Sequence, residues 1–181
     1  MAIFGTSWVS DAEKRIISPC DLLRDDFDPR DSMLRGISVK ATPQTVYKWL
    51  NQLQYGPYSY DWLDNPGRKS PQYLIEDNPS LKPGKPALGM FNIVSCEPDA
   101  HFTSVMKPNF FPGLKECAVT YIIVQHRDHC RLLVKINVIY KKSVVGYIMR
   151  ALLSLGDAIM MGKQLKNMKR LAERTEATYA A

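Results

Sequence analysis

The sequence VYKWLNQL occupies positions 46–53, and YSYDWLDN follows it at positions 58–65. The apolar residues of the first stretch recur at the i, i+3, i+4, i+7 spacing of an amphipathic helix: Val46, Trp49, Leu50 and Leu53. Thr42 can act as N-cap, and Pro43 can take the first helical position, where its missing N–H is not needed. Ser59 can cap a second short helix over 59–64. The two stretches therefore predict two short helices joined by a turn.

Strand patterns lie on both sides of these helices. Upstream, residues 33–41 alternate between apolar and polar side chains, as in a half-buried strand. Downstream, four prolines between 67 and 89 favour a covering loop. Stretches rich in β-branched and aromatic residues then predict strands at 88–96, 101–107, 117–125 and 131–140, with 126–129 as a hairpin connection. In the last strand Lys135 and Asn137 are expected to face solvent.

A long helix is expected to close the chain, capped by Ser143 and ending near Arg174. Its first half is apolar nearly all round and is expected to be buried on several sides, whereas its second half carries a narrow apolar stripe. The order is strand, two helices, a meander of antiparallel strands and a final helix. This order predicts an α+β fold.

Composition and length indicate one globular domain. The chain has 181 residues, of which 45% are apolar and 23% charged, values that exclude a disordered or fibrous protein. We expect an acidic, solvated lead-in over 1–30, the domain over 31–176 and a tail over 177–181. Because the four cysteines form no CxxC pair and no signal peptide is recognised, a reduced, cytoplasmic location is expected.

The net charge of +6 does not by itself indicate a nucleic-acid partner. The basic residues gather only near the end of the final helix, where cations complement the helix dipole, and no aromatic-interleaved basic motif accompanies them.

The apolar stretch 144–162 is interrupted by Arg150 and Asp157, which argues against a membrane span. Contact of this stretch with a membrane surface remains an alternative. The oligomeric state is left open.

The two opening stretches carry a family resemblance. They resemble uncharacterised members of the SRPBCC superfamily, also called START-like or polyketide cyclase/dehydrase-like, and the segment 160–173 resembles the close of the final helix in that superfamily. The resemblance spans roughly 31–176. It implies a helix-grip (Bet v 1-like) fold, with a curved antiparallel sheet wrapped around a long C-terminal helix and two short helices after the first strand. Relatives often carry a Gly-Asp pair before the second strand, whereas here Lys85 follows Gly84, so no role of that acid carries over.

The same resemblance implies an internal cavity for an apolar molecule, such as a lipid or polyketide, without implying one chemistry. We expect aromatic residues of the two short helices to ring its mouth: Trp49, Tyr58, Tyr60 and Trp62. Core packing explains these rings equally well. Further ligand contacts are expected from the sheet, at Phe91, Tyr121 and Ile123, and from the final helix, at Leu152, Leu155 and Ile159. Small residues at Ala151, Ala158 and Gly162 fit either a ligand space or close helix packing.

Catalytic and metal signals are weak. His101, Tyr60 and Asp61 are the acid–base candidates, and no nucleophile or phosphate-binding motif is found. The cluster His126, His129, Cys130 has the residue types of a zinc site but lies on one tight hairpin without a second chelating pair, so we expect no metal and no cofactor. The leading interpretation is therefore non-catalytic binding or transport of an apolar small molecule. The alternative is a cyclase/dehydratase-type enzyme acting on a polyketide-like substrate in the same cavity.

Overall fold

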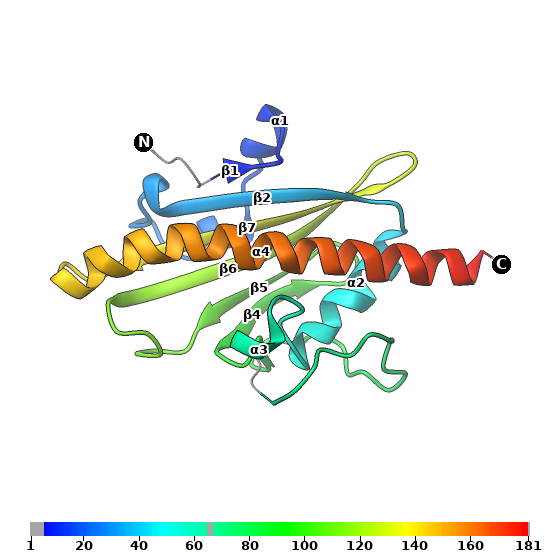
Figure 1. Ribbon diagram of the computed structural model, residues 1–181. Helices are drawn as coiled ribbons and strands as arrows, with labels where there is room; N and C mark the ends of the chain where they lie inside the picture. Colours follow the sequence, from blue (N-terminus) through cyan, green and yellow to red (C-terminus); the bar gives the residue numbers. More distant parts are fainter. Residues whose placement is uncertain (1–5, 65–66, 181) are drawn as a thin grey trace.

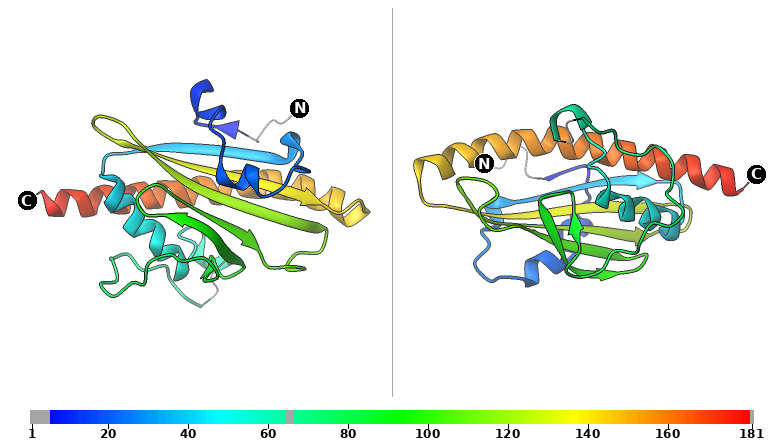
Figure 2. Two further views of the ribbon diagram at one scale, coloured as in Figure 1. Left: turned by 180° about the vertical axis from the view of Figure 1, so that it is seen from behind. Right: turned by 90° about the horizontal axis from the view of Figure 1, so that it is seen from below.

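A curved antiparallel sheet and one long helix dominate the computed structural model, which describes residues 6–64 and 67–180 (Figure 1). Within this part of the chain the sheet order is β1-β2-β7-β6-β5-β4-β3. The strands are β1 (Thr6–Ser7), β2 (Ser32–Val39), β3 (Pro86–Ala87), β4 (Phe91–Glu97), β5 (His101–Met106), β6 (Leu114–Gln125) and β7 (Cys130–Tyr140). All neighbours are antiparallel except β1, which runs parallel to β2. The helix α4 (Val144–Tyr179) crosses one face of the sheet (Figure 2).

Two short helices follow β2, as the sequence predicts. In α2 (Pro43–Asn51) the Thr42 hydroxyl accepts a hydrogen bond from the Thr45 backbone N–H at 3.3 Å, which confirms the predicted N-cap. The apolar face of α2 is buried, and the Trp49 indole donates to the Thr175 hydroxyl on α4 at 3.1 Å. The second helix, α3 (Asp61–Asp64), is a single turn. The predicted α+β fold, with its curved sheet, long final helix and two short helices, is therefore confirmed.

The two halves of α4 differ in their surroundings. The second half packs into the core through Leu165, Met168, Leu171 and Ala172. In the first half Leu152, Leu155 and Ile159 are 61%, 51% and 53% exposed, so the prediction that this half is buried on several sides is wrong. The physical reason is that the sheet covers only one side of the helix. An all-round apolar helix beside a single layer must leave one face uncovered.

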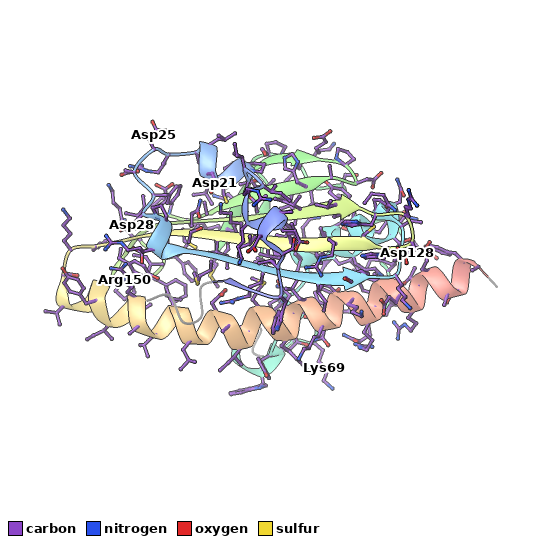
Figure 3. All side chains as sticks on the ribbon, turned by 90° about the horizontal axis from the view of Figure 1, so that it is seen from above. Asp21, Asp25, Asp28, Lys69, Asp128 and Arg150 are labelled. Carbon is purple, nitrogen blue, oxygen red and sulfur yellow. The ribbon has the colours of Figure 1, made fainter. Side chains whose placement is uncertain are left out.

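The N-terminal segment lies mostly on the face of the sheet opposite α4, although Trp8 and Asp31 near its two ends contact α4. It contains α1 (Asp11–Lys14) and the 3₁₀ turns η1 (Pro19–Leu22) and η2 (Pro29–Asp31), and Figure 3 labels Asp21, Asp25 and Asp28 on this side. The Asp21 carboxylate accepts hydrogen bonds from Lys135 Nζ at 2.7 Å and Asn137 Nδ2 at 2.8 Å. The expectation of a wholly solvated lead-in, with Lys135 and Asn137 facing solvent, is therefore wrong. A polar strand face can be covered when the covering segment supplies complementary charge.

We expect Asp21→Asn to destabilise the protein at neutral pH by about 1.5–3 kcal/mol, the range for hydrogen bonds to charged groups. Burial opposes ionisation of Asp21, but hydrogen bonds from Lys135, Asn137 and the Ser18 N–H outweigh it and hold its pKa below the ordinary value. A lowered folded-state pKa contributes stability above the unfolded pKa of about 3.9, and this stability is lost as the pH falls through the folded pKa. The difference in free energy of unfolding between the wild type and Asp21→Asn should therefore be smaller at acid pH than at neutral pH.

Urea unfolding at neutral and acid pH measures this difference. Asp25→Asn is the matched control, because Asp25 lies nearby on the same segment and is exposed. A deficit in Asp21→Asn that is the same at both pH values would contradict the assignment of the effect to the ionised carboxylate.

Candidate ligand cavity

A cavity of about 260 Å³ lies between the sheet and the first half of α4. Its wall is mostly apolar. The sheet and its loops contribute Met33, Leu88, Met90, Phe91, Met106, Phe111, Leu114, Cys117, Val119, Tyr121, Ile136 and Val138. The helix contributes Leu153, Gly156, Asp157, Met160, Met161 and Gln164, and the turn between α2 and α3 contributes Pro57 and Ser59. The cavity therefore lies between the curved sheet and the long helix, where the resemblance implies an internal cavity.

Methionines make up an unusual share of this wall. Five of the eight methionines in the chain line it: Met33, Met90, Met106, Met160 and Met161. Methionine side chains are unbranched and polarisable, so they adapt to ligands of different shape. The wall is therefore apolar and deformable rather than shaped for one rigid ligand.

One polar edge of the cavity is a chain of hydrogen bonds. The Tyr121 hydroxyl donates to Gln164 Oε1 at 2.7 Å, and Gln164 Nε2 donates to the Pro57 carbonyl at 2.6 Å. Burial raises the pKa of Tyr121, although the bond to Gln164 opposes this, so the hydroxyl stays neutral. This chain ties the turn after α2 to α4 and fixes two polar side chains at the cavity wall.

A buried ion pair forms the second polar edge. The guanidinium of Arg35 on β2 donates to Asp157 Oδ2 on α4, from Nε at 2.9 Å and from Nη2 at 2.5 Å. The two side chains are 2% and 10% exposed. Burial raises the pKa of Asp157, while the Arg35 charge and hydrogen bonds oppose that rise. The carboxyl group is thus the one acid that lines the cavity within the described residues.

The cavity thiol is not an activated nucleophile. Burial raises the pKa of Cys117 to about 12, and the nearby Asp157 charge adds to the effect. A thiol is nucleophilic as the thiolate, which this site disfavours. Covalent catalysis by Cys117 is therefore not supported.

The structure separates the predicted ligand contacts into three groups. Phe91 and Tyr121 line the cavity, and the Tyr121 ring stacks on Phe102 at 4.8 Å between centroids. Trp49, Tyr58 and Ile123 lie in the core without lining it, and Trp49 and Tyr58 form an edge-to-face pair with centroids 6.1 Å apart. Trp62 is 76% exposed, Tyr60 is half-buried, and neither lines the cavity.

The remaining predicted contacts are on α4. Leu152, Leu155 and Ile159 point away from the cavity, on the exposed side of the helix. Of the small residues, Gly162 lies under the Trp8 ring, where an added Cβ would stand 3.0 Å from the ring, and Ala151 is exposed. Close packing therefore accounts for Gly162. The small residue that faces the cavity is Gly156, which the sequence pattern did not single out.

The predicted acid–base residues lie elsewhere. His101 is at the start of β5, with Nε2 3.4 Å from the Ser95 hydroxyl and Nδ1 3.7 Å from Glu97 Oε2. Asp61 accepts hydrogen bonds from the backbone N–H and the hydroxyl of Ser70 at 2.8 and 2.5 Å, which gives it a structural role in the loop. Neither they nor Tyr60 line the cavity.

The histidine hairpin is not arranged as a metal site. The rings of His126 and His129 stack with centroids 5.0 Å apart, and the buried Cys130 thiol donates to the Ala41 carbonyl at 3.1 Å. In the part of the chain that the structure describes, no three histidine, cysteine or acidic side chains are placed to hold a metal ion.

Sequence reasoning missed Asp157 and Gln164, which line the cavity, and Arg35, which pairs with Asp157. Asp157 is visible in the sequence as a single acid within an apolar helical run, and Arg35 as a cation within a strand. A charge in an apolar run is expected to find a buried partner. Gln164 gave no comparable signal, because glutamine is common on exposed helix faces.

Comparisons with known proteins support the fold. The chain superposes on protein CV1439 from Chromobacterium violaceum (TM-score 0.51, 12% identity, 79% of this chain and 97% of that chain) and on Ms6760 from Mycobacterium smegmatis (0.51, 12%, 84% and 96%). It also superposes on the di-domain ARO/CYC StfQ from the steffimycin biosynthetic pathway (0.53, 13%, 81% of this chain and 52% of that chain). The chain thus corresponds to about half of StfQ. No protein-family model and no curated protein sequence matches the chain, and identities this low show the fold alone.

Proposed function

Because this chain has the SRPBCC or polyketide cyclase-like fold, we propose that it binds or transports an apolar small molecule in the cavity between the sheet and α4. The observation that carries the proposal is an apolar cavity with two fixed polar edges, Tyr121–Gln164 and Arg35–Asp157. Ligand sites of this kind combine an apolar wall with a few polar groups that orient the ligand.

The cavity dimensions narrow the ligand class. A volume of about 260 Å³ lies just below the roughly 300–1,000 Å³ of common ligand sites. The polar edges favour a ligand with one or two hydrogen-bonding groups on an otherwise apolar skeleton. We therefore infer a compact lipid-like or polyketide-like molecule, rather than one with several fused rings and many hydroxyl groups.

One observation favours a second candidate function, a cyclase/dehydratase-type enzyme. Asp157 lines the cavity and has a raised pKa, as general acids and bases often do. It would replace His101, Asp61 and Tyr60 as the acid–base candidate. The Arg35 pair gives Asp157 a structural role as well, so binding without catalysis stays the leading proposal.

Native mass spectrometry of the purified protein tests the proposal. We expect a bound apolar species that organic extraction removes and that rebinds when the extract is returned to the protein. Extraction of the unfolded protein provides the control for surface adsorption. Protein without any bound mass, combined with no binding across a panel of apolar fluorophores, would contradict both the binding and the enzyme proposals. Conversion of the rebound ligand into a product would support the enzyme proposal over binding without catalysis.

A further inference from the structure

The side of α4 that faces away from the sheet carries one continuous stripe of exposed side chains. Its members follow the three- and four-residue spacing of a single helix face: Val144, Ile148, Leu152, Leu155, Ile159, Lys163 and Lys166. The first five are apolar and the last two are cationic. We call this set the outer stripe. By helix geometry its apolar part extends over about 22 Å, at about 1.5 Å per residue.

The charged residues within this half of the helix are turned away from the outer stripe. Arg150 Nε donates to Asp31 Oδ1 on the N-terminal segment at 2.6 Å, and Asp157 pairs with Arg35 on β2. The exposed face from Val144 to Ile159 therefore presents no ionised group. An apolar face of this length and without charges is unusual on a protein surface and marks a contact site.

Lysines stand at both ends of the apolar part. Lys141 and Lys142 are exposed just before α4, and Lys163 and Lys166 continue the outer stripe after Ile159. Lys166 Nζ lies 6.0 Å from the Trp8 ring centroid, and both residues are exposed at the surface. The chain as a whole carries a net charge of +6. The chemistry that complements this surface is an apolar layer bordered by negative charge.

We propose that the outer stripe docks α4 flat onto a membrane surface that contains anionic lipids. The apolar side chains would enter the boundary between headgroups and acyl chains, and the lysines would contact lipid phosphates. By length and composition α4 could also cross a membrane. Spanning is disfavoured, because the pairs Arg150–Asp31 and Asp157–Arg35 hold this half of the helix on the sheet. A second copy is a poorer occupant, since the outer stripe holds no acidic side chain to pair with the lysines of another chain.

This inference concerns the outer side of α4 and goes beyond the proposed function. The opposite side of the same helix lines the cavity through Leu153, Gly156 and Met160. Docking would therefore bring the cavity wall next to the lipid layer. The two proposals can nevertheless fail separately, because they depend on different faces of α4.

Co-sedimentation of the full chain with lipid vesicles tests the docking. We expect binding to equimolar phosphatidylcholine–phosphatidylserine vesicles, weaker binding to phosphatidylcholine alone, and a decrease with added salt. The variant Ile148→Glu/Leu155→Glu should bind at least about tenfold more weakly, because it places two charges in the apolar layer. Both positions are exposed, so the fold should be retained, as circular dichroism can verify. Ile17→Glu is the matched control: Ile17 is 73% exposed on the N-terminal segment, and the variant should bind like the wild type.

Lys163→Glu/Lys166→Glu separates the electrostatic part of the contact. It should remove the preference for anionic vesicles and leave the weak binding to phosphatidylcholine. Wild-type protein that stays in the supernatant with both vesicle types would overturn the proposal. So would a wild-type dimer in sedimentation analysis that Ile148→Glu/Leu155→Glu dissociates, because the outer stripe would then belong to a second copy. Native mass spectrometry keeps the cavity separate. Wild-type protein that carries a ligand but binds no vesicles counts against docking alone, whereas both variants should retain the ligand, because their substitutions lie outside the cavity wall.

Discussion

Gly156→Leu is expected to weaken apolar ligand binding by at least about tenfold while raising the stability of the protein. Gly156 lines the cavity, and a Cβ built at this position meets no atom within 4 Å. The leucine side chain can therefore extend into the space that the ligand would occupy without moving the backbone. Glycine within a helix also costs about 0.8–1.0 kcal/mol relative to alanine, so the substitution should favour folding. Ligand occupancy by native mass spectrometry and thermal unfolding give the two readouts.

Two controls separate cavity filling from the change in helix propensity. Gly156→Ala should gain most of the stability with little loss of binding. Ala151→Leu adds the same side chain on the exposed side of α4 and should leave ligand binding unchanged. Full ligand occupancy in Gly156→Leu would show that the ligand lies elsewhere and would contradict the proposed site.

Arg35→Met is expected to cost about 3–5 kcal/mol at neutral pH, the range for removing one partner of a buried ion pair. The substitution leaves the Asp157 carboxylate in an apolar cavity without its guanidinium partner, so the pKa of Asp157 should rise further. A folded-state pKa above the unfolded value contributes stability that is complete below the unfolded pKa of about 3.9 and is lost as pH rises through the folded pKa. The deficit of the variant should therefore be smaller in acid than at neutral pH. Urea unfolding over this pH range measures it.

The double variant Arg35→Met/Asp157→Leu should recover most of the lost stability, because an apolar pair can replace a buried ion pair at little net cost. Arg150→Met is the matched control. It removes the same side-chain type from an ion pair in which Arg150 is more exposed, and should cost only about 0–1 kcal/mol. A double variant as unstable as Arg35→Met would show that the arginine acts mainly through other contacts.

The fold could be predicted because its signals are local. The Thr42–Pro43 cap, the spacing of Val46, Trp49 and Leu50, and the β-branched runs of the meander are each set by neighbouring residues, and the structure agrees with them. The faces of α4 were harder to assign. Its first half is apolar all round, so the periodicity does not indicate which face is buried. The expected ligand contacts Leu152 and Leu155 therefore face outward in the structure.

The candidate site is harder to predict from the sequence than the faces of α4, because it depends on contacts between distant parts of the chain. Arg35 and Asp157 are separated by 122 positions, and the bond from Tyr121 to Gln164 joins β6 to α4. Sequence patterns locate such residues on elements but do not pair them. The aromatic residues predict a mouth ringed by Trp49, Tyr58, Tyr60 and Trp62. In the structure the first two pack in the core, Tyr60 is half-buried outside the cavity wall, and Trp62 is exposed.

The methionine-rich wall makes the cavity sensitive to oxidation. Met33, Met90, Met106, Met160 and Met161 surround one space, so a sulfoxide formed on any of them adds a strong dipole to an otherwise apolar wall. A bound ligand shields these sulfur atoms, whereas an empty cavity admits small oxidants more easily. The affinity of the protein for an apolar ligand should therefore depend on the oxidation history of the protein, and methionine sulfoxide reductases would be the enzymes able to restore it.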